Sequence, residues 1–149
     1  MYVARILYPV EVLGPGRRVG IWFCGCPRRC RGCSNPELWE FDEKYRTTPD
    51  LVFKLIKMIA KDHAIEGFTI TGGDPIYQLD DLKKLITMIR SICDDIIVYT
   101  GYMIDEVDGE ILSQISMLID GPYIEELNDN SLIRGSSNQK IYILDKSKE

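Results

Sequence analysis

Three cysteines that lie close together are the residues best suited to chemistry in this 149-residue chain. Cys26, Cys30 and Cys33 have the spacing C-x3-C-x2-C, and the glycines and prolines around them predict a loop. A tight loop can direct three thiolates at one centre, and thiolates bind soft metals and iron–sulfur clusters. A 4Fe–4S cluster usually takes four cysteines, so three ligands would leave one iron open to a small molecule.

Cys24 keeps a second interpretation open, because with it the spacing becomes C-x-C-x3-C-x2-C. A closed four-thiolate zinc site or an electron-carrier module would also use four cysteines. The C-x-C pair is sterically tight for one tetrahedral ion, and Cys24 alternates away from the loop if the preceding strand continues to it. Cys93 is predicted to be an inert core thiol on the apolar side of a helix.

A glycine-rich turn is the second candidate site. Gly72, Gly73 and Asp74 directly follow a strand predicted at residues 67–71. Two glycines let a ligand approach the backbone because no Cβ intervenes, and Asp74 adds a carboxylate. Such turns often end strands without any chemical role. Ligands of α/β sheets, however, bind at the carboxyl ends of strands, so this turn and the cysteine loop are expected to meet at one edge.

Strand-like and helix-like segments alternate along the chain. Strands are predicted at residues 2–8, 19–23, 67–71, 96–100, 117–120 and 140–145, and helices at residues 49–63, 80–93 and 104–114. This order indicates an α/β fold with a mainly parallel sheet of βα units. A complete eight-unit barrel needs roughly 250 residues, so we expect an open or partial (β/α) barrel and a single domain over residues 1–149.

Apolar spacing also predicts which helix faces are buried. In the first helix, which Thr48 can cap, the apolar face consists of Leu51, Val52, Leu55, Ile56 and Ile59, with the lysines facing away. In the second helix the stripe consists of Leu82, Leu85, Ile86 and Ile89.

Composition and charge exclude several classes of function. The net charge is −5 without a dense basic stripe, which argues against nucleic-acid binding, and no apolar run is long enough to cross a membrane. The first residues lack a secretory signal, so the expected compartment is the cytoplasm, where thiols stay reduced. Because the chain has one histidine, His63, acid–base catalysis by histidine is not expected. His63 itself is predicted to be solvated.

The cysteine spacing, followed by a glycine-rich turn after the next strand, resembles the radical S-adenosylmethionine superfamily. More narrowly, the chain resembles the activating proteins of anaerobic (class III) ribonucleoside-triphosphate reductase. Matching segments run from near one end to the other, at residues 8–10, 14–16, 25–35, 71–75, 99–102, 120–123 and 134–139. The string Arg-Gly-Ser-Ser-Asn-Gln at residues 134–139 is the most discriminating and is expected to face a partner.

The resemblance implies two cofactors and the residues that hold them. Cys26, Cys30 and Cys33 would ligate a 4Fe–4S cluster, whose open iron would be chelated by the amino and carboxylate groups of S-adenosylmethionine. Further contacts to S-adenosylmethionine would come from Gly32, Ser34, Gly72, Gly73, Asp74, Tyr99 and Thr100, with the glycine turn holding the methionyl amino group. Two departures from the wider superfamily are Gly32, where an aromatic residue is common, and Asp74 in place of glutamate.

The activity implied by the resemblance is reductive cleavage of S-adenosylmethionine. The resulting radical would take a hydrogen atom from a glycine of the large reductase subunit. A one-electron donor such as flavodoxin would reduce the cluster, and no catalytic side chain would be needed. Alternatives are an activase of another glycyl-radical enzyme such as pyruvate formate-lyase, a small-molecule radical enzyme such as a deazaguanine-forming synthase, and the four-cysteine zinc or electron-carrier module.

Overall fold

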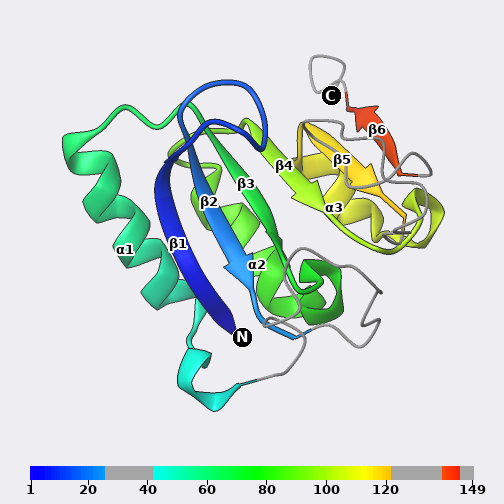
Figure 1. Cartoon of the computed structure of the whole chain (residues 1–149), viewed down its shortest axis with the longest axis horizontal. Coiled ribbons are helices and arrows are strands. Elements are labelled where there is room, and N and C mark those ends of the chain that lie inside the picture. The colour runs from blue at the N-terminus through cyan, green and yellow to red at the C-terminus, as the bar shows by residue number, and fades with distance from the viewer. Residues whose placement is uncertain (26–41, 122–138, 145–149) are drawn as a thin grey trace.

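The computed structural model describes residues 1–25, 42–121 and 139–144. Within these ranges, six strands form one open sheet in chain order (Figure 1). They are β1 (Val3–Val10), β2 (Arg18–Phe23), β3 (Gly67–Gly72), β4 (Ile96–Tyr99), β5 (Met117–Asp120) and β6 (Lys140–Ile143).

The sheet is mixed, which corrects the expectation of a mainly parallel arrangement at its two edges. The inner pairs β2–β3, β3–β4 and β4–β5 are parallel, whereas β1–β2 and β5–β6 are antiparallel. Residues 11–17 between β1 and β2 are too few for the crossover that a parallel pair requires, so β2 returns alongside β1 as a hairpin. The α/β class is confirmed, and the described strands do not close into a barrel.

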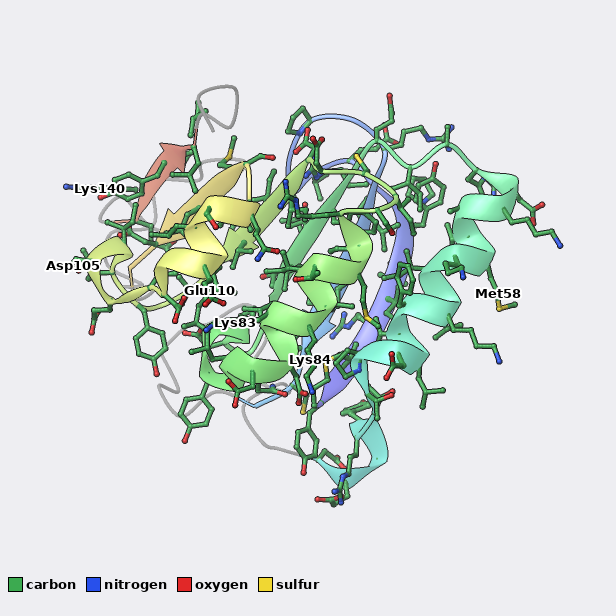
Figure 2. All side chains as sticks on the ribbon, turned by 180° about the vertical axis from the view of Figure 1, so that it is seen from behind. Met58, Lys83, Lys84, Asp105, Glu110 and Lys140 are labelled. Atoms are coloured by element: carbon green, nitrogen blue, oxygen red, sulfur yellow. The ribbon has the colours of Figure 1, made fainter. Side chains whose placement is uncertain are left out.

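The helices cover one face of this sheet. They are α1 (Pro49–Asp62), α2 (Leu79–Ile89) and α3 (Gly109–Gln114), with short 3-10 turns η2 (Glu43–Tyr45), η3 (Pro75–Gln78) and η4 (Ile104–Glu106). Figures 1 and 2 view the molecule from opposite sides, and only in Figure 2 do the helices lie in front of the strands. Across the described ranges, no helix has the length and apolar character needed to cross a bilayer.

The main core lies between the helices and the sheet. The stripe predicted for α2 is confirmed, because all four of its residues are fully buried. They pack with alternate side chains of the inner strands, which include Ile21, Phe23, Phe68, Ile70, Ile96 and Val98. The helix is shorter than expected and ends at Ile89. Cys93 therefore lies beyond the helix, although its half-buried side chain still packs against this core.

The buried face of α1 differs from the predicted one. Val52 and Ile56 are buried as expected, but Leu51 and Leu55 are 56% and 52% exposed. Phe53 packs against the core instead. The side of α1 that contacts the rest of the molecule is narrow and is centred on Val52 and Ile56. Leu51 and Leu55 lie beside it and face solvent. The predicted cap is confirmed, since Thr48 Oγ1 accepts a hydrogen bond from the Leu51 amide at 3.2 Å.

The acidic residues near α3 tie that helix to α2. Asp108 caps α3 by accepting from the amide of Glu110 at 2.8 Å, and Lys83 of α2 forms ion pairs with Asp108 and Glu110 (Figure 2). The Glu110 amide, followed by the Lys83 ammonium, lowers the pKa of Asp108 below its usual range. These groups are solvent-accessible, so their contribution to stability is small.

A buried arginine closes the end of the sheet opposite the predicted site. Arg18, the first residue of β2, is 0% exposed. Its guanidinium donates to Thr69 Oγ1 at 2.9 Å, to the carbonyls of Pro15 and Phe68 at 2.9 and 2.8 Å, and to Asp95 Oδ1 at 2.9 Å. These bonds join the starts of β2, β3 and β4. Asp95 remains 44% exposed, so water weakens the charge pair and leaves the hydrogen bonds as the main effect.

Replacing Arg18 by methionine would leave several buried acceptors without a donor. We expect Arg18→Met to lower the free energy of unfolding by about 3 kcal/mol, measured by urea denaturation. The matched change Arg17→Met, at the neighbouring exposed arginine, should stay within about 0.5 kcal/mol of the parent protein. Equal stability of the two variants would contradict the role given to Arg18.

Candidate functional site

The carboxyl ends of β2 and β3 are joined by backbone hydrogen bonds that continue past the sheet. The amide of Gly73 donates to the carbonyl of Phe23 at 2.8 Å, and the amide of Asp74 donates to the carbonyl of Gly25 at 3.2 Å. Gly25 immediately precedes Cys26 in the sequence. The residue that leads into the cysteine segment therefore lies against the glycine turn, which agrees with the expectation that both motifs follow strand ends at one edge of the sheet.

Both glycines are required by the chain itself. Gly72 has a φ of +109°, and a Cβ there would collide with the backbone nitrogen and oxygen of Phe23. A Cβ on Gly73 would come within 2.6 Å of the Gly25 carbonyl oxygen. The first reason for two glycines is therefore the close approach of β2. Both residues are half-exposed, so part of the turn is accessible to a ligand at this edge, although the Gly73 amide is already bonded to Phe23.

Asp74 is directed into the protein. Its side chain is 2% exposed, and Oδ1 accepts from the Thr100 hydroxyl at 2.8 Å and from the Ile76 amide at 3.2 Å. Oδ2 accepts from the Gly101 amide at 2.9 Å. The carboxylate thus links the end of β3 to the end of β4. The structure brings Asp74 and Thr100 together as a positioning pair, and a direct contact of Asp74 with a cofactor stays a prediction.

Tyr99 is the last residue of β4 and directly precedes Thr100 of this pair. The Thr100 amide donates to the Ile119 carbonyl at 3.0 Å, which fixes the end of β4 against β5. Tyr99 is half-buried, and this burial raises the pKa of its hydroxyl above the ordinary value despite the nearby charge of Arg18. Tyr99 is therefore neutral at physiological pH and can act as a hydrogen-bonding and packing group.

Residues 1–2 hold both ends of the segment that contains the cysteines. The Cys24 amide donates to the Tyr2 carbonyl at 2.9 Å, and the Thr47 amide donates to the Met1 carbonyl at 2.7 Å. Gln78 adds a further link, because it accepts from the Tyr2 amide at 2.9 Å and donates to the Cys24 carbonyl at 2.8 Å. The spacing of motifs gave no signal for Gln78, since its partners lie 54 and 76 residues away.

A buried carboxylate at the end of β5 was not among the predicted site residues. Asp120 is 0% exposed and accepts from the amides of Ile104 and Lys140 at 2.8 and 3.3 Å. Next to it, the carbonyl of Gly121 accepts from Gln139 Nε2 at 2.9 Å. The matching segments at residues 120–123 and 134–139 therefore meet at Gly121 and Gln139. Their resemblance to a family motif was the only signal.

The other predicted residues, Cys26, Cys30, Gly32, Cys33 and Ser34, lie outside the described residues. Within residues 1–25, 42–121 and 139–144, no group of three or more potential metal ligands is found. The structure therefore describes Gly25, which directly precedes the cysteine segment, and the glycine turn beside it.

Comparison with known proteins decides the family. A family described as a 4Fe-4S single cluster domain matches residues 12–142. An anaerobic ribonucleoside-triphosphate reductase-activating protein of Escherichia coli K12 is 36% identical over 148 residues, covering 92% of this chain and 96% of the relative. The protein of that name from Haemophilus influenzae is 37% identical over 91% of this chain and 94% of the relative. The chain belongs to the family of anaerobic ribonucleoside-triphosphate reductase-activating proteins.

Phage T4 has a further relative of that name, 33% identical over 142 residues, which cover 91% of this chain and 90% of the relative. The resemblance seen in the sequence is therefore confirmed. The iron–sulfur description of the matched family also favours a 4Fe–4S cluster over the zinc interpretation of the four cysteines. The match to the 4Fe-4S single cluster domain includes both the cysteine segment and the glycine turn, because residues 12–142 contain both.

Adding a methyl group at Gly73 tests the close approach of β2. We expect Gly73→Ala to lower the free energy of unfolding by about 2 kcal/mol, because its Cβ would press on the Gly25 carbonyl oxygen. Gly109→Ala is the matched control, since a Cβ there meets nothing within 4 Å. Thermal unfolding of both variants measures the difference. Two variants of similar stability would show that the turn tolerates a side chain.

Proposed function

We propose that this chain activates anaerobic ribonucleoside-triphosphate reductase by reductive cleavage of S-adenosylmethionine at a 4Fe–4S cluster. The likeness to activating proteins over 92% of the chain carries the proposal. The site geometry supports it, since the backbone that leads into the cysteines is hydrogen-bonded to the glycine turn. In this proposal residues 1–149 are one radical S-adenosylmethionine domain, built as an open partial barrel.

The cysteine segment fits the cluster by its donor set. Cys26, Cys30 and Cys33 would hold three irons and leave the fourth open, since thiolates are the usual ligands of such clusters. When bound, the cluster supplies the one-electron reduction of S-adenosylmethionine that leaves methionine, 5′-deoxyadenosine and a glycyl radical on the reductase. The chain provides binding, orientation and exclusion of water. A one-electron donor such as flavodoxin would reduce the cluster.

The residues around the cluster would orient S-adenosylmethionine. The half-exposed backbone of Gly72 and Gly73 is open to the methionyl amino group, and Asp74 fixes that backbone through its bonds to Thr100 and Gly101. Gly32 and Ser34, beside Cys33, would add contacts from the cysteine segment. Tyr99 and Thr100 lie at the end of β4, where they would face the ribose or adenine.

Replacing one cysteine tests the cluster assignment without disturbing the fold. We expect Cys30→Ala to abolish formation of 5′-deoxyadenosine by the dithionite-reduced protein, while its circular dichroism stays that of the parent. After anaerobic reconstitution the parent should bind about four irons and four sulfides. Cys93→Ala is the control, because Cys93 packs against the core, and it should retain both iron and cleavage activity.

The decisive measurement mixes the reduced protein, S-adenosylmethionine and the reductase. Electron paramagnetic resonance should detect a glycyl radical on the reductase with the parent protein and none with Cys30→Ala. Stoichiometric zinc without visible absorption, or cleavage activity that persists in Cys30→Ala, would overturn the cluster assignment.

The link between Asp74 and Thr100 is tested by removing one hydroxyl. We expect Thr100→Val to weaken S-adenosylmethionine binding about tenfold, because a charged hydrogen bond of 2.8 Å that fixes the turn is lost. Thr100→Ser, which keeps the hydroxyl, should stay close to the parent. Calorimetric titration of the reconstituted proteins measures the affinities, with iron content as the check on cluster loading. Equal losses in the two variants would indicate that the methyl group of Thr100 matters and its hydroxyl does not.

A further inference from the structure

The outer face of α1 carries an apolar stripe that the fold leaves in solvent. Leu51, Leu55 and Met58 are 56%, 52% and 62% exposed, and their spacing of four and three residues places them on one side of the helix. In Figure 2, Met58 points away from the rest of the molecule. Three large apolar side chains exposed on one helix are more than scattered surface residues, and such a group marks an interaction site.

A parallel stripe of lysines lies next to these residues. Lys54, Lys57 and Lys61 are exposed, and no carboxylate within the described ranges forms an ion pair with them. An open groove of about 430 Å³ lies over the lysine stripe and is lined by Asp50, Phe53, Lys54, Lys57, Met58 and Lys61, so Met58 is the residue of the apolar stripe that borders it. We call this groove and the two stripes the α1 face. It combines apolar contact area with a row of positive charges.

The charge of the α1 face identifies the chemistry of its partner. The chain as a whole has a net charge of −5, whereas on the α1 face three lysines outnumber one carboxylate, that of Asp50. Two copies of α1 packed face to face would bring like charges together. Packing the α1 face of one copy on an acidic region of the next would be a head-to-tail contact, which gives rings or open filaments of many copies. A different protein with acidic and apolar side chains fits best.

The α1 face begins beside the candidate site. Thr47, two residues before α1, is hydrogen-bonded to Met1, while Tyr2 is hydrogen-bonded to Cys24, next to the cysteine segment. The helix of 14 residues extends from there for about 21 Å. A large protein whose target residue reaches the site can therefore lie along α1 at the same time. This continuity favours the reductase over the smaller electron donor.

We infer that the α1 face is a docking surface for the anaerobic reductase, which contributes carboxylates to the lysines and apolar side chains to the groove. This inference rests on the proposed function and adds a second contact area to it. Apolar contacts give the complex its lifetime, and the lysines speed association and make it sensitive to salt.

The test measures binding of the reconstituted chain to the purified reductase. Lys57→Glu should weaken the complex several-fold, and the triple change of Lys54, Lys57 and Lys61 to glutamate on the order of tenfold or more. Raising the ionic strength from about 0.01 to 0.15 M should weaken the parent complex much more than the triple variant. Leu55→Ser tests the apolar stripe and should increase the dissociation rate.

Lys84→Glu is the matched control, because Lys84 is an exposed lysine on α2 (Figure 2). It should bind the reductase like the parent protein. Circular dichroism checks that each variant is folded, and Lys57→Glu alone remains informative if the triple variant unfolds. All variants should cleave S-adenosylmethionine with dithionite in the absence of reductase, since the α1 face is not part of the candidate site.

The outcomes separate this inference from the proposed function. If the parent protein cleaves S-adenosylmethionine and activates the reductase while Lys57→Glu and Leu55→Ser bind it unchanged, the docking surface is wrong and the function stands. If the same variants impair only reduction by flavodoxin, or only self-association in sedimentation, the reductase is not the occupant. If the parent neither cleaves S-adenosylmethionine nor forms a glycyl radical, the proposed function itself fails.

Discussion

The approach of two backbones at the ends of β2 and β3 is the constraint on which the rest of the site depends. Parallel strands normally separate where their ladder ends, but here the contact continues through Gly73 to Phe23 and through Asp74 to Gly25. It is possible only because residues 72 and 73 have no Cβ. Everything that follows β2, including the cysteine segment, starts from a position that this contact sets. The buried carboxylate of Asp74 then extends the same constraint to β4.

Much of this arrangement could be predicted from the sequence, because its signals are local. Strand alternation, the proline and threonine at the start of α1 and the apolar stripe of α2 each reflect interactions within a few residues, and the structure confirms them. That Gly25, which precedes the cysteines, lies beside the glycine turn followed from a topological rule about strand ends. The antiparallel edges of the sheet were missed, because strand direction depends on the connection and not on the strand's own residues.

Two further features show where local patterns stop being informative. The apolar spacing of α1 suggested a wide buried face, but how much of a helix is covered depends on its neighbours, and α1 presents Leu51 and Leu55 to solvent. Asp74 is predicted to contact S-adenosylmethionine, and this stays a prediction, but no local signal in the sequence indicated its hydrogen bonds within the fold. Its partners, Thr100 and Gly101, lie 26 and 27 residues further along, and only the folded chain brings them within reach.

The anchoring of the cysteine segment on residues 1–2 has a consequence for how iron reaches the protein. The bonds from Cys24 to Tyr2, from Thr47 to Met1 and from Gln78 to both Tyr2 and Cys24 use backbone and amide groups, none of which is a proposed iron ligand. The frame on either side of the segment can therefore be complete before any metal arrives. These hydrogen bonds need no metal, so this frame is compatible both with the iron-free chain and with the chain that holds the cluster.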